Sequence, residues 1–182
     1  IAAAECEECF SPRYDAIWRE YRYWIAPGAV DPFLRRTCYT PRVDVDEAAI
    51  NAGARLMLGT WDFASFAGGG EGVPWSERSR RPRGTVRTVL SCACRRVELA
   101  QGPGLVAGQS AIEIRVAADG FLPRMVRNIV GALVEVGQGR RNHEWIAEVL
   151  DARDRRLGSV LAPPQGLTLW RVGFGDDALE TW

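Results

Sequence analysis

The fold of this chain is decided at residues 121–137, which read FLPRMVRNIVGALVEVG. Apolar side chains recur in this stretch every three or four positions, which is the spacing of one face of a helix. The residues at this spacing are Leu122, Val126, Ile129, Leu133 and Val136. Met125, Val130 and Val134 widen the apolar face until little polar surface remains. A helix of this kind must be covered on most sides, so the stretch predicts the centre of a hydrophobic core.

One charged residue interrupts this apolar surface. Arg127 lies three and seven positions before Val130 and Val134, and residues at those spacings share one face of a helix. An arginine in such a place either extends its guanidinium group to the rim of the core or is buried and paired with a carboxylate. No obvious partner occurs in this sequence, which suggests that a carboxylate from another segment faces Arg127.

Alternation of apolar and polar residues predicts the strands that pack beside this helix. In residues 110–118 apolar side chains alternate cleanly with charged ones. Residues 85–99 have apolar side chains at both the odd and the even positions, so both faces of that strand can be covered. The sequence Gln-Gly-Pro-Gly at 101–104 joins these two segments and predicts that they form an antiparallel pair. An aromatic segment at 19–25 and a short segment at 166–174 predict two more strands.

Two further helices are predicted, at 44–58 and at 142–150. In the first of them Asp44 is the expected N-cap, and Glu47 three residues later completes a capping box. The resulting order is strand, helix, two strands, two helices and a final strand. This order predicts an α+β fold over residues 1–182, a mostly antiparallel sheet with helices packed on one face.

The composition excludes several kinds of chemistry. The chain has 23 basic and 23 acidic residues, every basic residue is arginine, and the only histidine is His143. Schiff-base and phosphate-loop lysines are therefore excluded, and a histidine-based triad is not expected. Catalysis by this chain must use carboxylates, arginines or cysteines. No segment has the roughly 20 apolar residues that cross a bilayer, and no signal peptide is apparent, so we expect a cytoplasmic protein that does not enter a membrane.

Five cysteines offer an alternative kind of site. Cys6 and Cys9 form a CxxC motif, and Cys92 and Cys94 form a CxC motif, so four thiolates could hold zinc. Two glutamates fill the gap of the first motif, however, and the second lies within a predicted strand. We therefore expect thiols without a metal, and a cysteine-based metal or redox protein stays an alternative.

Two segments between residues 58 and 84 concentrate unusual residues. Residues 58–66 place aromatic side chains beside Asp62, as expected either of a well-packed loop after a helix or of a binding site. Residues 68–84 are rich in glycine, proline and arginine, and are either a solvated charge run or a loop that contacts phosphates. The arginines of this loop are Arg78, Arg80, Arg81 and Arg83.

Five motifs, taken together, connect this sequence to a known family. They read FSPRYDA at 10–16 followed by REYRY at 19–23, GTWDFASF at 59–66, TVRTV at 85–89, GFL at 120–122 with MVRNIVG at 125–131, and APPQGLTL at 162–169. In content and order they resemble the bacterial tRNA pseudouridine synthase A family. The resemblance spans nearly the whole chain and implies that it is the C-terminal lobe of the pseudouridine synthase fold.

The resemblance also implies an activity that needs neither a metal nor an organic cofactor. A uridine in the tRNA anticodon arm is flipped out of its stack, an aspartate attacks the nucleoside, and the base rotates and rejoins through carbon. By resemblance, Tyr21 stacks on the target base, Arg127 pairs with the catalytic aspartate, and Leu167 lines the pocket. The expected substrate-binding residues are Arg13, Arg19, Asp62 and Phe63 together with Arg78, Arg80, Arg81 and Arg83. Members of the family are typically homodimers.

Two departures from the family pattern affect these expectations. Trp61 stands where the family usually has histidine, which leaves a polar role at that position in doubt. The Gly-Arg-Thr-Asp segment with the catalytic aspartate does not occur in this sequence, and in the family it lies upstream of the part matched here. The chain by itself is therefore expected to be inactive. The alternative to the enzyme is a non-catalytic module that binds RNA and dimerises.

Overall fold

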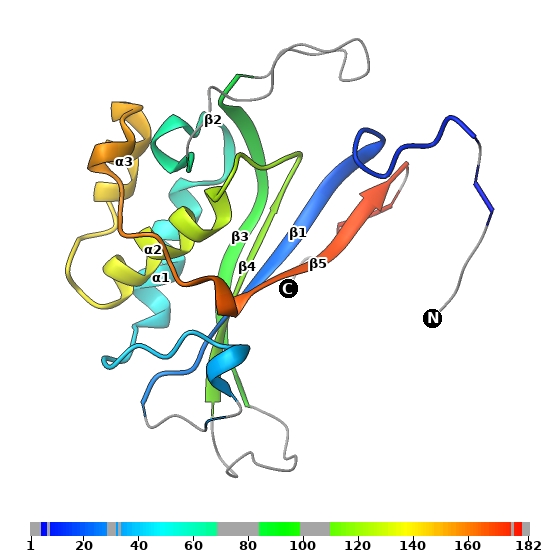
Figure 1. The fold of residues 1–182 in the computed structure, drawn as a ribbon. Helices are drawn as coiled ribbons and strands as arrows, with labels where there is room; N and C mark the ends of the chain where they lie inside the picture. Colours follow the sequence, from blue (N-terminus) through cyan, green and yellow to red (C-terminus); the bar gives the residue numbers. More distant parts are fainter. Residues whose placement is uncertain are drawn as a thin grey trace.

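A computed structural model gives the structure of this chain for residues 5–6, 8–28, 32, 34–68, 84–98, 110–175 and 177–179. Within these residues a five-stranded antiparallel sheet forms the centre, and three α-helices cover one of its faces (Figure 1). This confirms the α+β fold with helices on one side that the sequence predicts. No helix in the described part of the chain is long and apolar enough to span a membrane.

The sheet is built from strands that are far apart in the sequence. The strands are β1 (Ala16–Ile25), β2 (Gly59–Asp62), β3 (Val86–Glu98), β4 (Ser110–Ala118) and β5 (Leu167–Phe174). They lie in the order β2-β3-β4-β1-β5, and each neighbouring pair is antiparallel. The predicted pairing of residues 85–99 with 110–118 is confirmed. Strand β2 is not evident from the sequence, because four residues are too few for an alternating pattern to stand out.

The helices are α1 (Glu47–Leu56), α2 (Met125–Gly137) and α3 (Trp145–Ala152). Every residue of α2 except Arg127 and Glu135 is buried, which confirms that residues 121–137 contain the helix at the centre of the core. The helix begins four residues later than its periodicity predicts. Pro123 favours an extended conformation for the residue before it, and Arg124 adopts a left-handed conformation with φ of 61°.

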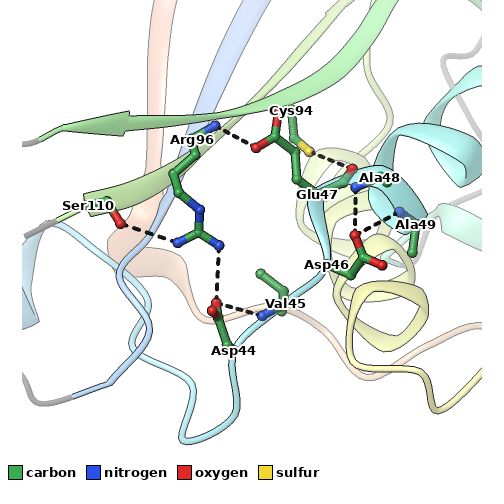
Figure 2. A network of polar contacts seen from close by, with 9 residues as sticks. All are labelled: Asp44, Val45, Asp46, Glu47, Ala48, Ala49, Cys94, Arg96 and Ser110. Carbon is green, nitrogen blue, oxygen red and sulfur yellow. Dashed lines mark hydrogen bonds and ion pairs between the residues drawn. The ribbon is translucent and has the colours of Figure 1, made fainter.

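The start of α1 differs from the prediction. Asp46, not Asp44, is the N-cap, and its carboxylate accepts hydrogen bonds of 2.8 and 3.4 Å from two backbone N–H groups in the first turn. Asp44 instead pairs with Arg96 of β3 at 3.4 Å, and Glu47 accepts a hydrogen bond from the backbone N–H of Arg96 (Figure 2). The predicted capping box is wrong because partners on β3 engage both carboxylates.

A bulge in β3 changes which side chains face the core. Simple alternation places Leu90 and Cys92 on the same face, but the register between β3 and β4 shifts between Val89 and Ser91. The extra residue turns Leu90 outward, where 46% of its surface is exposed. Val89 faces the core, as do Cys92 and Cys94.

Burial of two thiols in this core makes stability depend on pH. The core disfavours thiolate, which raises the pKa values of Cys92 and Cys94 from 9.0 to about 12. Between these values the unfolded chain binds fewer protons than the folded chain, so the free energy of unfolding falls as the pH rises. We expect this fall between pH 9 and 12, by up to about 1.4 kcal/mol per pH unit for each thiol. Urea denaturation at a series of pH values measures it.

A Cys94→Ala variant serves as the control for this experiment, because it removes one of the two titrating groups. Its free energy of unfolding is expected to decline less steeply with pH than that of the unaltered chain. Equal slopes for the two proteins above pH 9 would show that the buried thiol does not cause the dependence.

The face of the sheet away from the helices carries buried charges, which we call the charge ladder. Glu113 of β4 is fully buried and pairs with Arg22 of β1 at 2.6 Å and with Arg95 of β3 at 2.8 Å. Arg22 also pairs with Glu20 at 2.9 Å, and Glu20 pairs with Arg115 at 3.0 Å. Charges so deeply buried are tolerated only when they are paired, so the ladder joins three strands through their side chains.

Candidate functional site

A cavity of about 260 Å³ lies where β1 begins and β4 ends, and we call it the Tyr21 cavity. Its lining residues are Arg13, Tyr14, Arg19, Tyr21, Arg87, Gly120 and Phe121. The structure therefore brings together Arg13, Arg19 and Tyr21, three of the residues singled out by the family resemblance. Arg87 is an additional member of this site.

The ring of Tyr21 is fixed by packing while it lines the cavity. Tyr21 lies on the helix-facing side of β1, is half-buried, and packs against the core. Phe121, which follows β4, meets its ring edge-on at 5.1 Å between centroids and an interplanar angle of 90°. Edge-to-face contact is a favourable arrangement for two aromatic rings. Tyr21 is thus a firmly held aromatic surface at the wall of a cavity.

Two arginines flank the end of β4. Arg19 of β1 is opposite Ala118 on one side, and Val89 of β3 is opposite Ala118 on the other. Alternate residues of a strand share a face, so Arg19 lies on the same face as Tyr21, and Arg87 on the same face as Val89. The sheet therefore directs both arginines toward one corner, from strands that are distant in sequence.

Backbone carbonyl groups orient both guanidinium groups. Arg19 donates to the carbonyl oxygens of Ala16 at 3.1 Å and Asp119 at 3.3 Å. Arg87 is only 2% exposed and donates to the carbonyl oxygen of Gly84 at 3.1 Å. These carbonyl groups contribute to the orientation of the two guanidinium groups, and both arginines make further interactions. Alternation alone does not identify Arg87 as a site residue, because it leaves open which face of β3 meets the core.

Arg127 is the charged residue on the otherwise buried helix α2. It is half-buried, and its Nε donates to the carbonyl oxygen of Ala162 at 2.7 Å. The backbone N–H of Ala162 in turn donates to the carbonyl oxygen of Arg127 at 3.2 Å. Within the described residues this carbonyl is the hydrogen-bond partner of its side chain, and no ion pair to a carboxylate is formed there. Helix α2 therefore places the guanidinium group of Arg127 against the turn at Ala162, and not against a carboxylate of the described residues.

Tyr23 connects Arg127 with the strand that carries Tyr21. It lies two residues beyond Tyr21 on the same face of β1, and its hydroxyl donates to the carbonyl oxygen of Pro163 at 2.7 Å. Burial raises the pKa of Tyr23 above its ordinary value, Tyr39 adds to the rise, and the positive charge of Arg127 opposes it. Tyr23 and Arg127 thus bind consecutive residues of one turn, so this turn is anchored to both β1 and α2.

Leu167 is held beside the same tyrosine. It is the first residue of β5, is half-buried, and lies opposite Tyr23 in the β1–β5 register. A Cβ atom on Gly166 would lie 2.8 Å from the Tyr23 ring and 2.7 Å from the carbonyl oxygen of Trp24. Only glycine fits at these distances. Gly166 therefore lets the chain bring Leu167 against β1.

The other predicted substrate-binding residues lie elsewhere. Asp62 ends β2, where it accepts hydrogen bonds from the backbone N–H of Ala64 at 3.0 Å and the hydroxyl of Thr85 at 2.5 Å. Phe63 is fully buried and packs against Phe66. Neither lines the Tyr21 cavity, and their part in substrate binding stays a prediction. Trp61, at the position of the family histidine, is 43% exposed.

The remaining predictions concern the basic loop and the cysteines. The loop arginines Arg78, Arg80, Arg81 and Arg83 lie outside the described residues. Cys6 and Cys9 are exposed, whereas Cys92 and Cys94 are buried on β3. In the part of the chain that the structure describes, no three histidine, cysteine or acidic side chains are grouped so that they could hold a metal ion.

Comparison with known proteins agrees with these features. The family described as tRNA pseudouridine synthase matches residues 54–175. The chain is 41% identical over 179 residues to tRNA pseudouridine synthase A of Roseiflexus sp. (strain RS-1), with 97% of this chain and 59% of that protein covered. It is 35% identical over 176 residues to tRNA pseudouridine synthase A of Coxiella burnetii (strain Dugway 5J108-111), with 94% and 59% covered.

A third relative shows the same relation between the lengths. The chain is 37% identical over 176 residues to tRNA pseudouridine synthase A of Geobacillus kaustophilus (strain HTA426), with 96% of this chain and 60% of that protein covered. The chain thus spans about three fifths of the length of the curated relatives it matches. The segment that matches the family, residues 54–175, includes Arg87, Arg127 and Leu167. This chain belongs to the tRNA pseudouridine synthase family.

Proposed function

We propose that this chain is the C-terminal lobe of an enzyme that converts uridine to pseudouridine in the anticodon stem–loop of tRNA. The observation that carries the proposal is the Tyr21 cavity, in which a fixed aromatic ring and arginine side chains line one space. A flipped base needs a surface on which to stack, and its flanking phosphates need cations. The cavity offers both kinds of group.

Each of the three residues assigned by resemblance has a physical task in this reaction. The ring of Tyr21, held edge-on by Phe121, offers a stacking surface for the target base and so offsets part of the cost of flipping it. Arg127 pairs with a catalytic aspartate that another segment of the protein supplies, and this pairing favours the ionised carboxylate needed for attack. Leu167 is proposed to form the apolar wall of the base pocket, although neither Leu167 nor Arg127 is among the residues that line the Tyr21 cavity.

The wider assignments rest on the family resemblance. The complete protein is proposed to contain an upstream lobe with the catalytic aspartate, to act on tRNA without a metal or organic cofactor, and to work as a homodimer in the cytoplasm. Residues 1–182 are proposed to form one lobe, which agrees with their single sheet and shared core in the described residues.

A comparison of the chain with the complete protein tests this function. The complete protein, including its upstream segment, is expected to release tritium from tRNA labelled at C5 of uridine. The 182-residue chain alone is expected to bind the tRNA but to release no tritium. The physical reason is that a bound nucleoside cannot be attacked without the carboxylate nucleophile.

Two other outcomes would change the proposal. Turnover by the chain alone would show that an internal carboxylate, such as Asp15 or Asp62, can act as the nucleophile. RNA binding without turnover by the complete protein would favour the alternative, a non-catalytic RNA-binding and dimerisation module.

A further inference from the structure

Residues 158–163, which we call the return segment, lead from α3 back toward β5 and cross α2 on the way (Figure 1). The hydroxyl of Ser159 donates to the carbonyl oxygen of Asn128 in α2 at 3.1 Å. The backbone N–H of Ala162 donates to the carbonyl oxygen of Arg127 at 3.2 Å. A carbonyl oxygen has two lone pairs, so it can accept such a bond besides one within the helix. The return segment is therefore tied to the backbone of α2, and its position fixes the Ala162 carbonyl group that Arg127 contacts.

Gly131 makes this close crossing possible. It is buried on the side of α2 that the return segment crosses. A Cβ atom there would overlap the carbonyl oxygen of Val160 and lie 2.8 Å from the hydroxyl oxygen of Ser159. The obstructing group at Val160 is backbone, so it cannot turn aside as a flexible side chain could. Glycine inside a helix is less favourable than alanine, and the crossing gives a physical reason for its presence here.

The beginning of the return segment is held by Arg155. One of its terminal nitrogens donates to the side-chain oxygen of Asn128 at 2.8 Å, and both donate to the carbonyl oxygen of Ser159 at 3.2 Å. Asn128 is only 1% exposed and donates to the carbonyl oxygen of Phe66 at 2.6 Å. The segment is thus fastened to α2 directly before Val160 as well as after it, so a displacement of Val160 moves its neighbours too.

We infer that Gly131 is a positioning residue for the proposed reaction: it sets how closely the return segment approaches α2 and thereby orients the guanidinium group of Arg127. The inference rests on the proposed function, in which Arg127 pairs with the catalytic aspartate. The Nε of Arg127 donates to Ala162, so a carboxylate has to pair through the two terminal nitrogens. A planar guanidinium group that is bound at Nε offers its other donors in one fixed direction. The return segment thereby presents Arg127 to the incoming aspartate in one orientation.

Hydrogen exchange in the 182-residue chain tests this orientation without turnover. We would measure the exchange rate of the Arg127 Nε–H by proton–nitrogen NMR, with the signal assigned by its absence in Arg127→Ala. Gly131→Ala displaces the return segment outward by about 1 Å, because the new Cβ atom and the Val160 carbonyl oxygen must separate to van der Waals contact. The hydrogen bond to Ala162 is thereby weakened, and the Nε–H is expected to exchange about tenfold faster. An unchanged exchange rate would overturn the inference.

Gly137→Ala is the matched control. Gly137 ends the same helix, is buried, and has as little room, because a Cβ atom there would lie 2.7 Å from the Ile50 side chain and 3.2 Å from that of Val45. The variant therefore strains the packing of α2 at a place that the return segment does not touch. It is expected to leave the exchange of the Arg127 Nε–H unchanged. Equal acceleration in both variants would indicate a general loosening of α2 and would refute the role of Gly131.

In the complete protein, Gly131→Ala is expected to lower the single-turnover rate of tritium release about 10²-fold, because a misplacement of about 1 Å at the site has an effect of this size. The dissociation constant for tRNA is expected to stay the same. In the Arg127→Ala background, Gly131→Ala is expected to cause no further loss, because it acts through Arg127. Losses that multiply would show that Gly131 serves the fold and not Arg127, which contradicts the inference.

The same rates separate this inference from the proposed function. A normal rate in Gly131→Ala together with a slow rate in Arg127→Ala would overturn the role of Gly131 and leave the proposed function standing. Absence of turnover by the unaltered complete protein would instead overturn the proposed function, and hydrogen exchange would still decide whether Gly131 orients Arg127.

If Gly131→Ala does not fold, Arg155→Gln replaces it. This substitution removes the donors that hold the carbonyl oxygen of Ser159, whereas its control, Arg156→Gln, removes a neighbouring arginine whose side chain is 89% exposed. Arg155→Gln is expected to speed exchange of the same Nε–H and to slow tritium release, and Arg156→Gln is expected to do neither. An Arg155→Gln protein that matches the unaltered protein in both measurements would show that the return segment does not orient Arg127.

Discussion

Replacing Arg127 by alanine in the complete protein is expected to reduce pseudouridine formation by a factor on the order of 10² to 10³ and to leave the fold intact. The guanidinium group is half-buried on α2, and its hydrogen bond in the described residues runs to the carbonyl oxygen of Ala162. A catalytic carboxylate brought beside it would gain a fixed positive partner. Loss of that partner disfavours the ionised form of the nucleophile, so the rate of attack falls.

The measurement is tritium release from labelled tRNA under single-turnover conditions, together with a thermal melting curve. Arg127→Lys tests the geometry, since lysine keeps the charge but cannot form two parallel hydrogen bonds with a carboxylate. Arg140→Ala is the control, because this arginine is exposed just beyond the end of α2. Undiminished tritium release by Arg127→Ala would show that the assignment of Arg127 is wrong.

The largest effect on stability is expected for Glu113→Ala, at about 3–5 kcal/mol of lost free energy of unfolding. The carboxylate of Glu113 is fully buried and accepts hydrogen bonds from Arg22 at 2.6 Å and Arg95 at 2.9 Å. The side chain of Arg22 is only 14% exposed, and removal of Glu113 leaves Glu20 as its remaining ion-pair partner in the charge ladder. A buried charge that loses a partner is far more costly than a surface charge that does so.

Urea denaturation of the chain at neutral pH measures this effect. Asp44→Ala is the control because it breaks an ion pair with Arg96 at the surface, where such pairs contribute about 1 kcal/mol or less. A double-mutant cycle of Glu113→Ala with Arg22→Met isolates the coupling between the two side chains. A loss for Glu113→Ala no larger than that for Asp44→Ala would contradict the view that the ladder is a buried, mutually dependent network.

Patterns along single segments predicted much of the fold. Three- and four-residue spacing predicted the central helix, and α2 is indeed buried at every position except Arg127 and Glu135. Clean alternation predicted β4, and the Gln-Gly-Pro-Gly connection at 101–104 predicted its antiparallel pairing with β3. Both patterns are local, because the side-chain directions of a helix or strand repeat with a fixed period. The cap of α1 was wrongly predicted, because the choice between Asp44 and Asp46 depends on Arg96 of a distant strand.

For the candidate site too, some residues were evident from the sequence and others only from the tertiary structure. The sequence by itself determined that an arginine sits on the apolar face of α2, and its motifs identified Tyr21, Arg127 and Leu167 as residues of interest. Only the tertiary structure decided that Arg87 joins Arg19 at the Tyr21 cavity. That meeting depends on the bulge and register of β3 against β4, and on β1 lying on the other side of β4. The period of a strand fixes which residues share a face, but the pairing of strands and the packing of helices decide what each face meets.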